Sequence, residues 1–183
     1  DTIAYVAWGP VGLVILNVSE PTSPSLISTC STADWSLDVR VVGDHAYVAD
    51  RFGGLRIIDV SDLTNPEEVG HYVAPAGCAE KIYVVGNYVY IAYGGGGLRI
   101  VDVSDPTNPQ EIGYLQTSGD ASDVFVVGNC AYVTQTYCYD GLLIVDVSDP
   151  TSPQLVHSYE TAAWTYDVYC SGGYAYLAED WAG

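Results

Sequence analysis

One internal repeat dominates this chain of 183 residues. The block from Gly12 to Pro24 returns at 54–66, 97–109 and 141–153, so successive copies start 42, 43 and 44 residues apart. A second block recurs in step with the first, at 38–50, 81–93, 123–135 and 167–179. A chain that repeats itself at such spacing builds one structural unit per period, and each unit buries its apolar surface against the next.

Each period contains four short apolar stretches bounded by Gly, Pro, Asn or Asp, as strands joined by tight turns require. In the second period these strands are expected at 38–42, 46–50, 55–60 and 68–73. The 19 Gly and 9 Pro residues favour turns over long helices. Four strands in about 40 to 45 residues are the dimensions of one propeller blade. The sequence therefore predicts an all-β fold, a β-propeller of four-stranded antiparallel blades.

We expect a single propeller domain over residues 1–183, with about four blade repeats at 1–43, 44–86, 87–128 and 129–171. A surplus strand is expected at 174–183, because Ala4–Ala7 and Ala175–Ala178 are the same strand of the period. Four blades and one extra strand do not close neatly, so the chain is expected to be a segment of a larger propeller. The alternative is a four-bladed ring in which one terminal strand is displaced or pairs with another chain.

The decapeptides Gly-Leu-Arg-Ile-Val-Asp-Val-Ser-Asp-Pro at 97–106 and Gly-Leu-Leu-Ile-Val-Asp-Val-Ser-Asp-Pro at 141–150 resemble the signature of LVIVD-repeat proteins. The resemblance covers essentially the whole chain, with departures at Asn17, in place of Asp, and at Leu63, in place of Pro. It implies a propeller in a secreted or surface-exposed bacterial or archaeal protein, and hence an extracellular or cell-surface location. It transfers no catalytic motif.

The formal charge of −18 limits the partners that this surface can attract. Such an acidic protein repels phosphate backbones and anionic lipids, so we expect no nucleic acid partner. No run of 18 apolar residues is present, so we expect no membrane insertion. The chain begins with Asp1 rather than Met, which indicates a processed product or an internal piece of a longer protein.

The cysteines at positions 30, 78, 130, 138 and 170 form no Cys-x-x-Cys pair. This spacing argues against a zinc knuckle and against a small disulfide scaffold. Most of them are expected to be buried thiols, Cys170 above all, because it stands at a Val position of an apolar strand. Cys78 and Cys138 are the pair to test for a disulfide between loops.

Insertions fall in only two of the four connections of the period, at 136–140 and between Val73 and Lys81. In a propeller these connections emerge on one face, around the mouth of the central channel, and loops on a rigid scaffold carry binding residues. The candidate ligand-binding residues on this face are Asp34, Trp35, Asp38, Phe52, Asp120, Asp123, Tyr137, Trp164, Asp167 and Trp181. Aromatic rings beside carboxylates can stack on sugars or grip a partner side chain, but Trp35 and Trp164 can equally fill gaps between blades.

Asp38, Asp123 and Asp167 begin the innermost strand of three periods, and Lys81 interrupts the series. A ring of carboxylates at a channel mouth can hold Ca²⁺, the one cofactor considered for this chain. The alternative is that these residues accept hydrogen bonds from neighbouring backbone amides. The acids of each Asp-Val-Ser-Asp-Pro turn recur in every blade, so we interpret them as turn builders.

The histidines at positions 45, 71 and 157 lie apart in the repeat, and no catalytic constellation is evident. The leading prediction is a non-catalytic extracellular module that binds a protein or a glycan, or acts as a surface scaffold. One alternative is a carbohydrate-active hydrolase or lyase that uses two carboxylates such as Asp123 and Asp167. Another is a structural subunit of an extracellular polymer that self-associates through its terminal edge strands.

Overall fold

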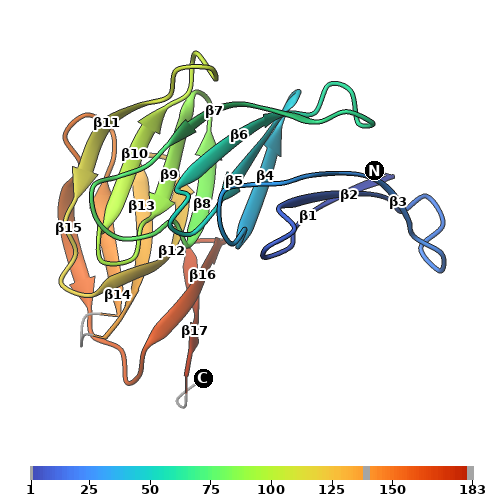
Figure 1. Cartoon of the computed structure of the whole chain (residues 1–183). Helices are drawn as coiled ribbons and strands as arrows, with labels where there is room; N and C mark the ends of the chain where they lie inside the picture. The colour runs from blue at the N-terminus through green and yellow to red at the C-terminus, as the bar shows by residue number, and fades with distance from the viewer. Residues whose placement is uncertain (1, 138–140, 181–183) are drawn as a thin grey trace.

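A computed structural model describes residues 2–137 and 141–180, and all regular structure in these ranges is β-strand. Trp181 and Cys138, both named in the predictions, lie outside the described residues. Within the described residues, seventeen strands follow one another and form antiparallel sheets in sequence order (Figure 1). The predicted all-β class is therefore confirmed.

The first sheet contains β1 (Ile3–Ala7), β2 (Leu13–Asn17) and β3 (Ser25–Cys30). Three four-stranded sheets follow. The second sheet contains β4 (Asp38–Val42), β5 (His45–Ala49), β6 (Leu55–Asp59) and β7 (Glu67–Tyr72). The third contains β8 (Lys81–Val85), β9 (Tyr88–Ala92), β10 (Leu98–Asp102) and β11 (Gln110–Leu115). The fourth contains β12 (Asp120–Val127), β13 (Cys130–Thr136), β14 (Leu142–Asp146) and β15 (Gln154–Tyr159).

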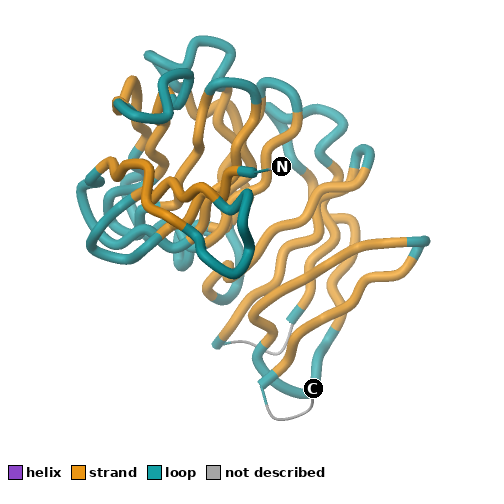
Figure 2. Tube along the Cα trace, turned by 90° about the vertical axis from the view of Figure 1, so that its right-hand side faces the viewer, coloured by secondary structure: helices purple, strands orange, loops and turns teal. Residues whose placement is uncertain are grey.

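A two-stranded sheet follows the fourth sheet, with β16 (Thr165–Ser171) paired to β17 (Tyr174–Glu179). The strand expected at 174–183 is thus the second strand of a hairpin. The four-stranded sheets begin at Asp38, Lys81 and Asp120, so repeat limits such as 43/44 lie in the turn between a first and a second strand. Loops join the strands at the ends of the sheets (Figure 2).

Two kinds of turn account for most of this regularity. Gly43 and its equivalents Gly86, Gly128 and Gly172 have φ near +60° in the tight turns between first and second strands, where an L side chain would be strained. At the other corner, Asp102 Oδ1 accepts a hydrogen bond of 2.8 Å from the Ser104 amide, and the same bond recurs from Ser61 to Asp59. The recurring acids are therefore turn builders, as predicted.

The apolar core lies between successive sheets. Leu13 and Ile15 of the first sheet pack with Val48 of the second, and Ile57 of the second packs with Ile91 of the third. A third cluster joins the third and fourth sheets. The inner strands are buried on both faces for this reason, which explains their nearly continuous apolar sequence.

The first strands of neighbouring sheets also contact one another. β4 contacts β8, β8 contacts β12, and β12 contacts β16. Residues that precede or begin these strands are consequently gathered in one region of the molecule. No helix in the described part of the chain has the length and apolar composition needed to cross a membrane.

Candidate functional site

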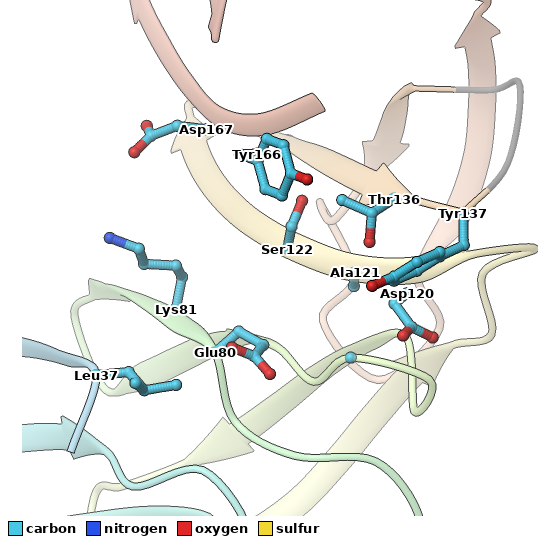
Figure 3. A pocket seen from close by; sticks show the side chains of 11 residues that line it. Leu37, Glu80, Lys81, Asp120, Ala121, Ser122, Thr136, Tyr137, Tyr166 and Asp167 are labelled. Atoms are coloured by element: carbon cyan, nitrogen blue, oxygen red, sulfur yellow. The ribbon is translucent and has the colours of Figure 1, made fainter. Parts of the chain in front are cut away.

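A cavity of about 500 Å³ opens where the first strands begin (Figure 3). Its charged lining residues are Glu80, Lys81, Asp120 and Asp167, and its aromatic lining residues are Tyr137 and Tyr166. In the view of Figure 3, Asp167 and Lys81 lie at one end of the cavity, and Tyr137 and Asp120 lie at the other. The cavity thus combines carboxylates, one ammonium group and two phenol rings on residues from three sheets.

The cavity lining follows the repeat. Leu37, Glu80, Ser122 and Tyr166 occupy the same position of four periods, directly before the first-strand position held by an acid or by Lys81, and all four line the cavity. One scaffold position is therefore filled by an apolar, an acidic, a hydroxyl and an aromatic side chain. The differences among these residue types give the cavity two unlike ends, although the backbone around it repeats.

The structure brings together only some of the predicted residues. Asp120, Tyr137 and Asp167 line the cavity, and the ring of Trp164 supports Tyr137 at a centroid distance of 4.6 Å. Tyr166 was not predicted. The available signal was its place directly before Asp167, a position whose residue type changes in every repeat.

Asp34, Trp35 and Phe52 do not line the cavity. An Asp34 carboxylate oxygen accepts a hydrogen bond from the Phe52 amide at 3.1 Å. This bond links the loop between β3 and β4 to the loop between β5 and β6. The Trp35 ring packs on Gly9 of the first sheet, where an added Cβ would lie 2.8 Å from the ring. Trp35 therefore contacts the loop between β1 and β2 outside the cavity, and its side chain is 48% exposed, so its place in a ligand site stays a prediction.

A buried side chain accepts a hydrogen bond from a backbone amide of the loop that precedes each four-stranded sheet. Asp50 is fully buried and accepts hydrogen bonds from the Asp34 amide at 2.9 Å and from the Thr32 hydroxyl at 2.6 Å. At the equivalent position of the next periods, the Tyr93 hydroxyl accepts from the Ala74 amide at 3.1 Å, and Gln135 Oε1 accepts from the Gly119 amide at 3.0 Å. Sequence reasoning missed this role because three different residue types perform it.

Asp38 and Asp123 join neighbouring sheets. Asp38 Oδ2 accepts a hydrogen bond from the Ile82 amide at 3.1 Å, and Asp123 Oδ2 accepts one from the Val168 amide at 2.8 Å. Of the two interpretations of these acids, the structure shows the bond to a neighbouring backbone amide. Both side chains are buried, so neither is an open ligand-binding group.

The two joints differ in the residue that precedes the donated amide, which is Lys81 before Ile82 and Asp167 before Val168. Burial raises the pKa of Asp123 to about 6, the adjacent Asp167 carboxylate adds to the increase, and the Val168 amide opposes it. An acid so perturbed beside a cavity is a chemically distinctive group.

Within residues 2–137 and 141–180, no three His, Cys, Asp or Glu side chains come together in an arrangement that could hold a metal ion. One oxygen of Asp38 and one of Asp123, which a Ca²⁺ ring would require, are instead engaged by backbone amides. The hypothesis of a Ca²⁺ site therefore gains no support from the geometry.

Four cysteines, at positions 30, 78, 130 and 170, are free and partly buried thiols. Cys78 lies beside the cavity, where its thiol donates a hydrogen bond of 3.0 Å to Glu80 Oε1. Burial foremost, and then Glu80, raise the pKa of Cys78 to about 12, so this thiol stays protonated at neutral pH.

Comparison with solved structures shows which proteins share the fold. A computationally designed protein called Ika8 is similar over 98% of this chain and 53% of its own, with 7% identity and a TM-score of 0.76. A functionally unknown protein from Desulfotomaculum acetoxidans is similar over 98% of this chain and 62% of its own, with 14% identity and a TM-score of 0.76. The chain thus spans less than two thirds of either protein.

A second designed protein, Ika4, is similar over 79% of this chain and 84% of its own, with 8% identity and a TM-score of 0.63. At these identities the likeness concerns the fold alone. A search of curated proteins gave no match.

The sequence profile of the LVIVD repeat matches five segments, at residues 3–32, 36–74, 76–117, 118–161 and 164–183. These segments follow the sheets: the three matches in the middle enclose β4–β7, β8–β11 and β12–β15, and the last begins just before β16. The chain therefore belongs to the LVIVD repeat family.

Proposed function

We propose that the sheets of this chain are blades of a β-propeller and that the cavity lies at the mouth of its channel. Contacts between successive first strands support this arrangement, since those strands surround the channel in a propeller. The convergence of four equivalent residues on one cavity supports it further. A straight stack of sheets would instead place equivalent residues in a row, one repeat apart.

In this proposal the chain is a non-catalytic extracellular module that binds a glycan in the cavity. The observation that carries the proposal is the pair of exposed phenol rings, Tyr137 and Tyr166, beside three carboxylates. Phenol rings stack on the apolar faces of sugars, and carboxylates accept hydrogen bonds from sugar hydroxyls. The volume of about 500 Å³ lies within the usual range for small-molecule sites.

The backbone at Tyr137 is consistent with a binding role. Tyr137 has φ of 61°, a left-handed conformation that costs a non-glycine residue about 1 to 3 kcal/mol. The side chain is 69% exposed, yet its ring rests on Trp164. A ring held in place before the ligand arrives loses less conformational entropy on binding.

The test is a glycan array probed with the full chain, followed by calorimetry with each glycan that binds. Tyr137→Ala and Tyr166→Ala are each expected to weaken binding about tenfold or more, which corresponds to the loss of one stacking contact of about 1.5 kcal/mol. Tyr159→Ala is the matched control, because Tyr159 is also exposed but does not line the cavity.

Two outcomes would overturn the glycan proposal. The first is that the unmodified chain binds no glycan, or binds only a protein. The second is that the folded double variant at Tyr137 and Tyr166 binds its glycan as tightly as the unmodified chain.

The Asp123–Asp167 pair favours a second candidate, hydrolysis of a glycosidic bond. A carboxyl group with a pKa of about 6 beside another carboxylate has the properties of a general acid. We prefer the non-catalytic proposal because Asp123 is only 6% exposed and does not line the cavity. Release of reducing ends from oligosaccharides, abolished by Asp123→Asn, would favour the hydrolase.

A further inference from the structure

The joint between β12 and β16 includes two hydrogen bonds and a contact between two aromatic rings. The Ser122 hydroxyl donates a hydrogen bond of 2.7 Å to the Thr165 carbonyl, and Asp123 accepts from the Val168 amide at 2.8 Å. Further along, the rings of Phe125 and Tyr169 meet edge to face, with centroids 5.3 Å apart. The Asp123 carboxylate therefore makes one of the hydrogen bonds that join the β16–β17 hairpin to the fourth sheet.

The charged surroundings of Asp123 are predominantly acidic. From β16, Asp167 faces it directly, and from β13 its partner Thr134 contributes a buried hydroxyl group that does not titrate. From the side of β8, Glu80 and Lys81 line the same cavity, as does Asp120 of β12. Lys81 forms no ion pair with any of the residues that the structure describes.

The joint between β4 and β8 supplies an internal control. There Asp38 accepts from Ile82 as Asp123 accepts from Val168, but the residue before the donated amide is Lys81 instead of Asp167. In the first joint the Asp38 carboxylate lies 3.3 Å from the Arg40 guanidinium, whereas in the second joint the Asp123 carboxylate has a second carboxylate, Asp167, beside it. A proton can relieve the repulsion only in the second case.

We propose that the β12–β16 joint is an acid-sensitive contact, in which the Asp123–Asp167 pair takes up one proton and thereby tightens the docking of the β16–β17 hairpin. At neutral pH the pair loses this proton, both carboxylates are charged, and the hairpin opens more often. Tyr166 and Asp167 belong to this hairpin and line the cavity, so the cavity wall on that side becomes less ordered as the pH rises.

The direction follows from proton linkage. Burial and Asp167 raise the pKa of Asp123 from its ordinary value of 3.8 to about 6 when the hairpin is docked, and we expect release of the hairpin to return the pKa toward 3.8. The docked state therefore binds more protons between these values, and docking is favoured below pH 3.8 and weakens as the pH rises through 6. Between pH 5 and pH 7.5 the equilibrium constant for docking should fall by about tenfold.

The experiment is residue-resolved amide hydrogen exchange on the full chain at pH 5 and pH 7.5. The protection factor of each amide is first corrected for the intrinsic exchange rate at that pH. The protection factor of the Val168 amide is then divided by that of the Ile82 amide, which makes the equivalent hydrogen bond in the β4–β8 joint. We expect the ratio to fall about tenfold at the higher pH. No ligand is present, so this result is independent of glycan binding.

Two variants test whether the Asp123–Asp167 pair causes the pH dependence of this ratio. Asp123→Asn keeps an oxygen that can accept from Val168 but does not titrate, and should make the ratio independent of pH. Asp167→Asn removes the second carboxylate of the pair and should make the fall of the ratio smaller than in the unmodified chain. A ratio unchanged in the unmodified chain, or one that falls equally in Asp123→Asn, would overturn the proposal.

Discussion

The β8–β9 hairpin of the third sheet and the β16–β17 hairpin are nearly the same local structure. Lys81–Ala92 and residues 167–178 share three Tyr positions, a Gly in the turn and a final Ala, and both pair in one register, with Tyr83 opposite Tyr90 and Tyr169 opposite Tyr176. Their surroundings differ. Tyr90 is 4% exposed, whereas Tyr176, at the equivalent position, is 59% exposed.

The difference shows which property belongs to the strand and which to its neighbours. β9 is covered by β10 in its own sheet and packs on the apolar clusters shared with the second and fourth sheets. Within the described residues, β17 pairs with β16 alone. The hairpin pattern therefore specifies pairing and register, and only the adjacent sheets make the same tyrosine a core residue.

The largest expected contrast is between Tyr90→Ala and Tyr176→Ala. Removing the buried ring of Tyr90 leaves a cavity between two sheets and should lower the free energy of unfolding by about 3 to 5 kcal/mol. Removing the exposed ring of Tyr176 should cost less than about 1 kcal/mol. Urea unfolding followed by circular dichroism measures both, and equal losses would contradict the comparison.

A smaller contrast is expected between the β4–β5 hairpin of the second sheet and the β16–β17 hairpin, which differ in their polar contacts. Asp50→Ala removes the buried acceptor for the Asp34 amide and leaves Arg56 Nε, 3.5 Å from Asp50, without its carboxylate, so we expect a loss of about 3 kcal/mol. Glu179 stands at the equivalent position of β17, and Glu179→Ala should change stability by about 0.5 kcal/mol or less. Thermal unfolding of the two variants side by side tests this, with Asp50→Asn as the variant that keeps an acceptor oxygen.

The smallest expected effect is that of a substitution in the tight turn of each hairpin. It should be the same in the β8–β9 and β16–β17 hairpins, because it depends only on the conformation of the turn itself. Gly86 and Gly172 have φ of 58° and 60° in the turns of the two hairpins, and an added Cβ would meet no atom within 4 Å at either place. Replacement by Ala should cost about 1 kcal/mol in each, from backbone conformation alone. Amide exchange within each hairpin measures the cost, and unequal values would show that neighbours influence even the turn.

The strands and turns were predictable because short-range chemistry specifies them. Short apolar stretches bounded by turn residues predict β5 and β9, and the recurrence of Asp in the Asp-Val-Ser-Asp-Pro turns predicts its role as a turn builder, which the structure confirms. Asp120, Tyr137 and Asp167 were predictable for a similar reason. They lie in loops or near the starts of first strands, and the order of the strands predicts that these segments emerge at the same end of each sheet, where the three residues line the cavity.

The remaining site residues were not predictable from their types. Asp34 and Trp35 resemble ligand-binding residues in sequence, but one caps a neighbouring loop and the other covers Gly9. Tyr166 resembles any strand-edge tyrosine, yet it lines the cavity. Such roles depend on which backbone atoms of another sheet come within reach of a side chain, and these distances have no signature in the local sequence.

The amino-acid sequence by itself determined the unit: four strands per period, their register, their tight turns and the order of the sheets, because each follows from contacts between residues close in the chain. Only the tertiary structure decided which contacts the side chains at equivalent positions of the repeat make. Asp38 and Asp123 occupy one place in the repeat, but the residue beside their bonded amide is Lys81 in one joint and Asp167 in the other. Electrostatic environment depends on what neighbouring sheets bring within a few ångströms, and for this reason burial and the Asp167 carboxylate of the next sheet raise the pKa of Asp123.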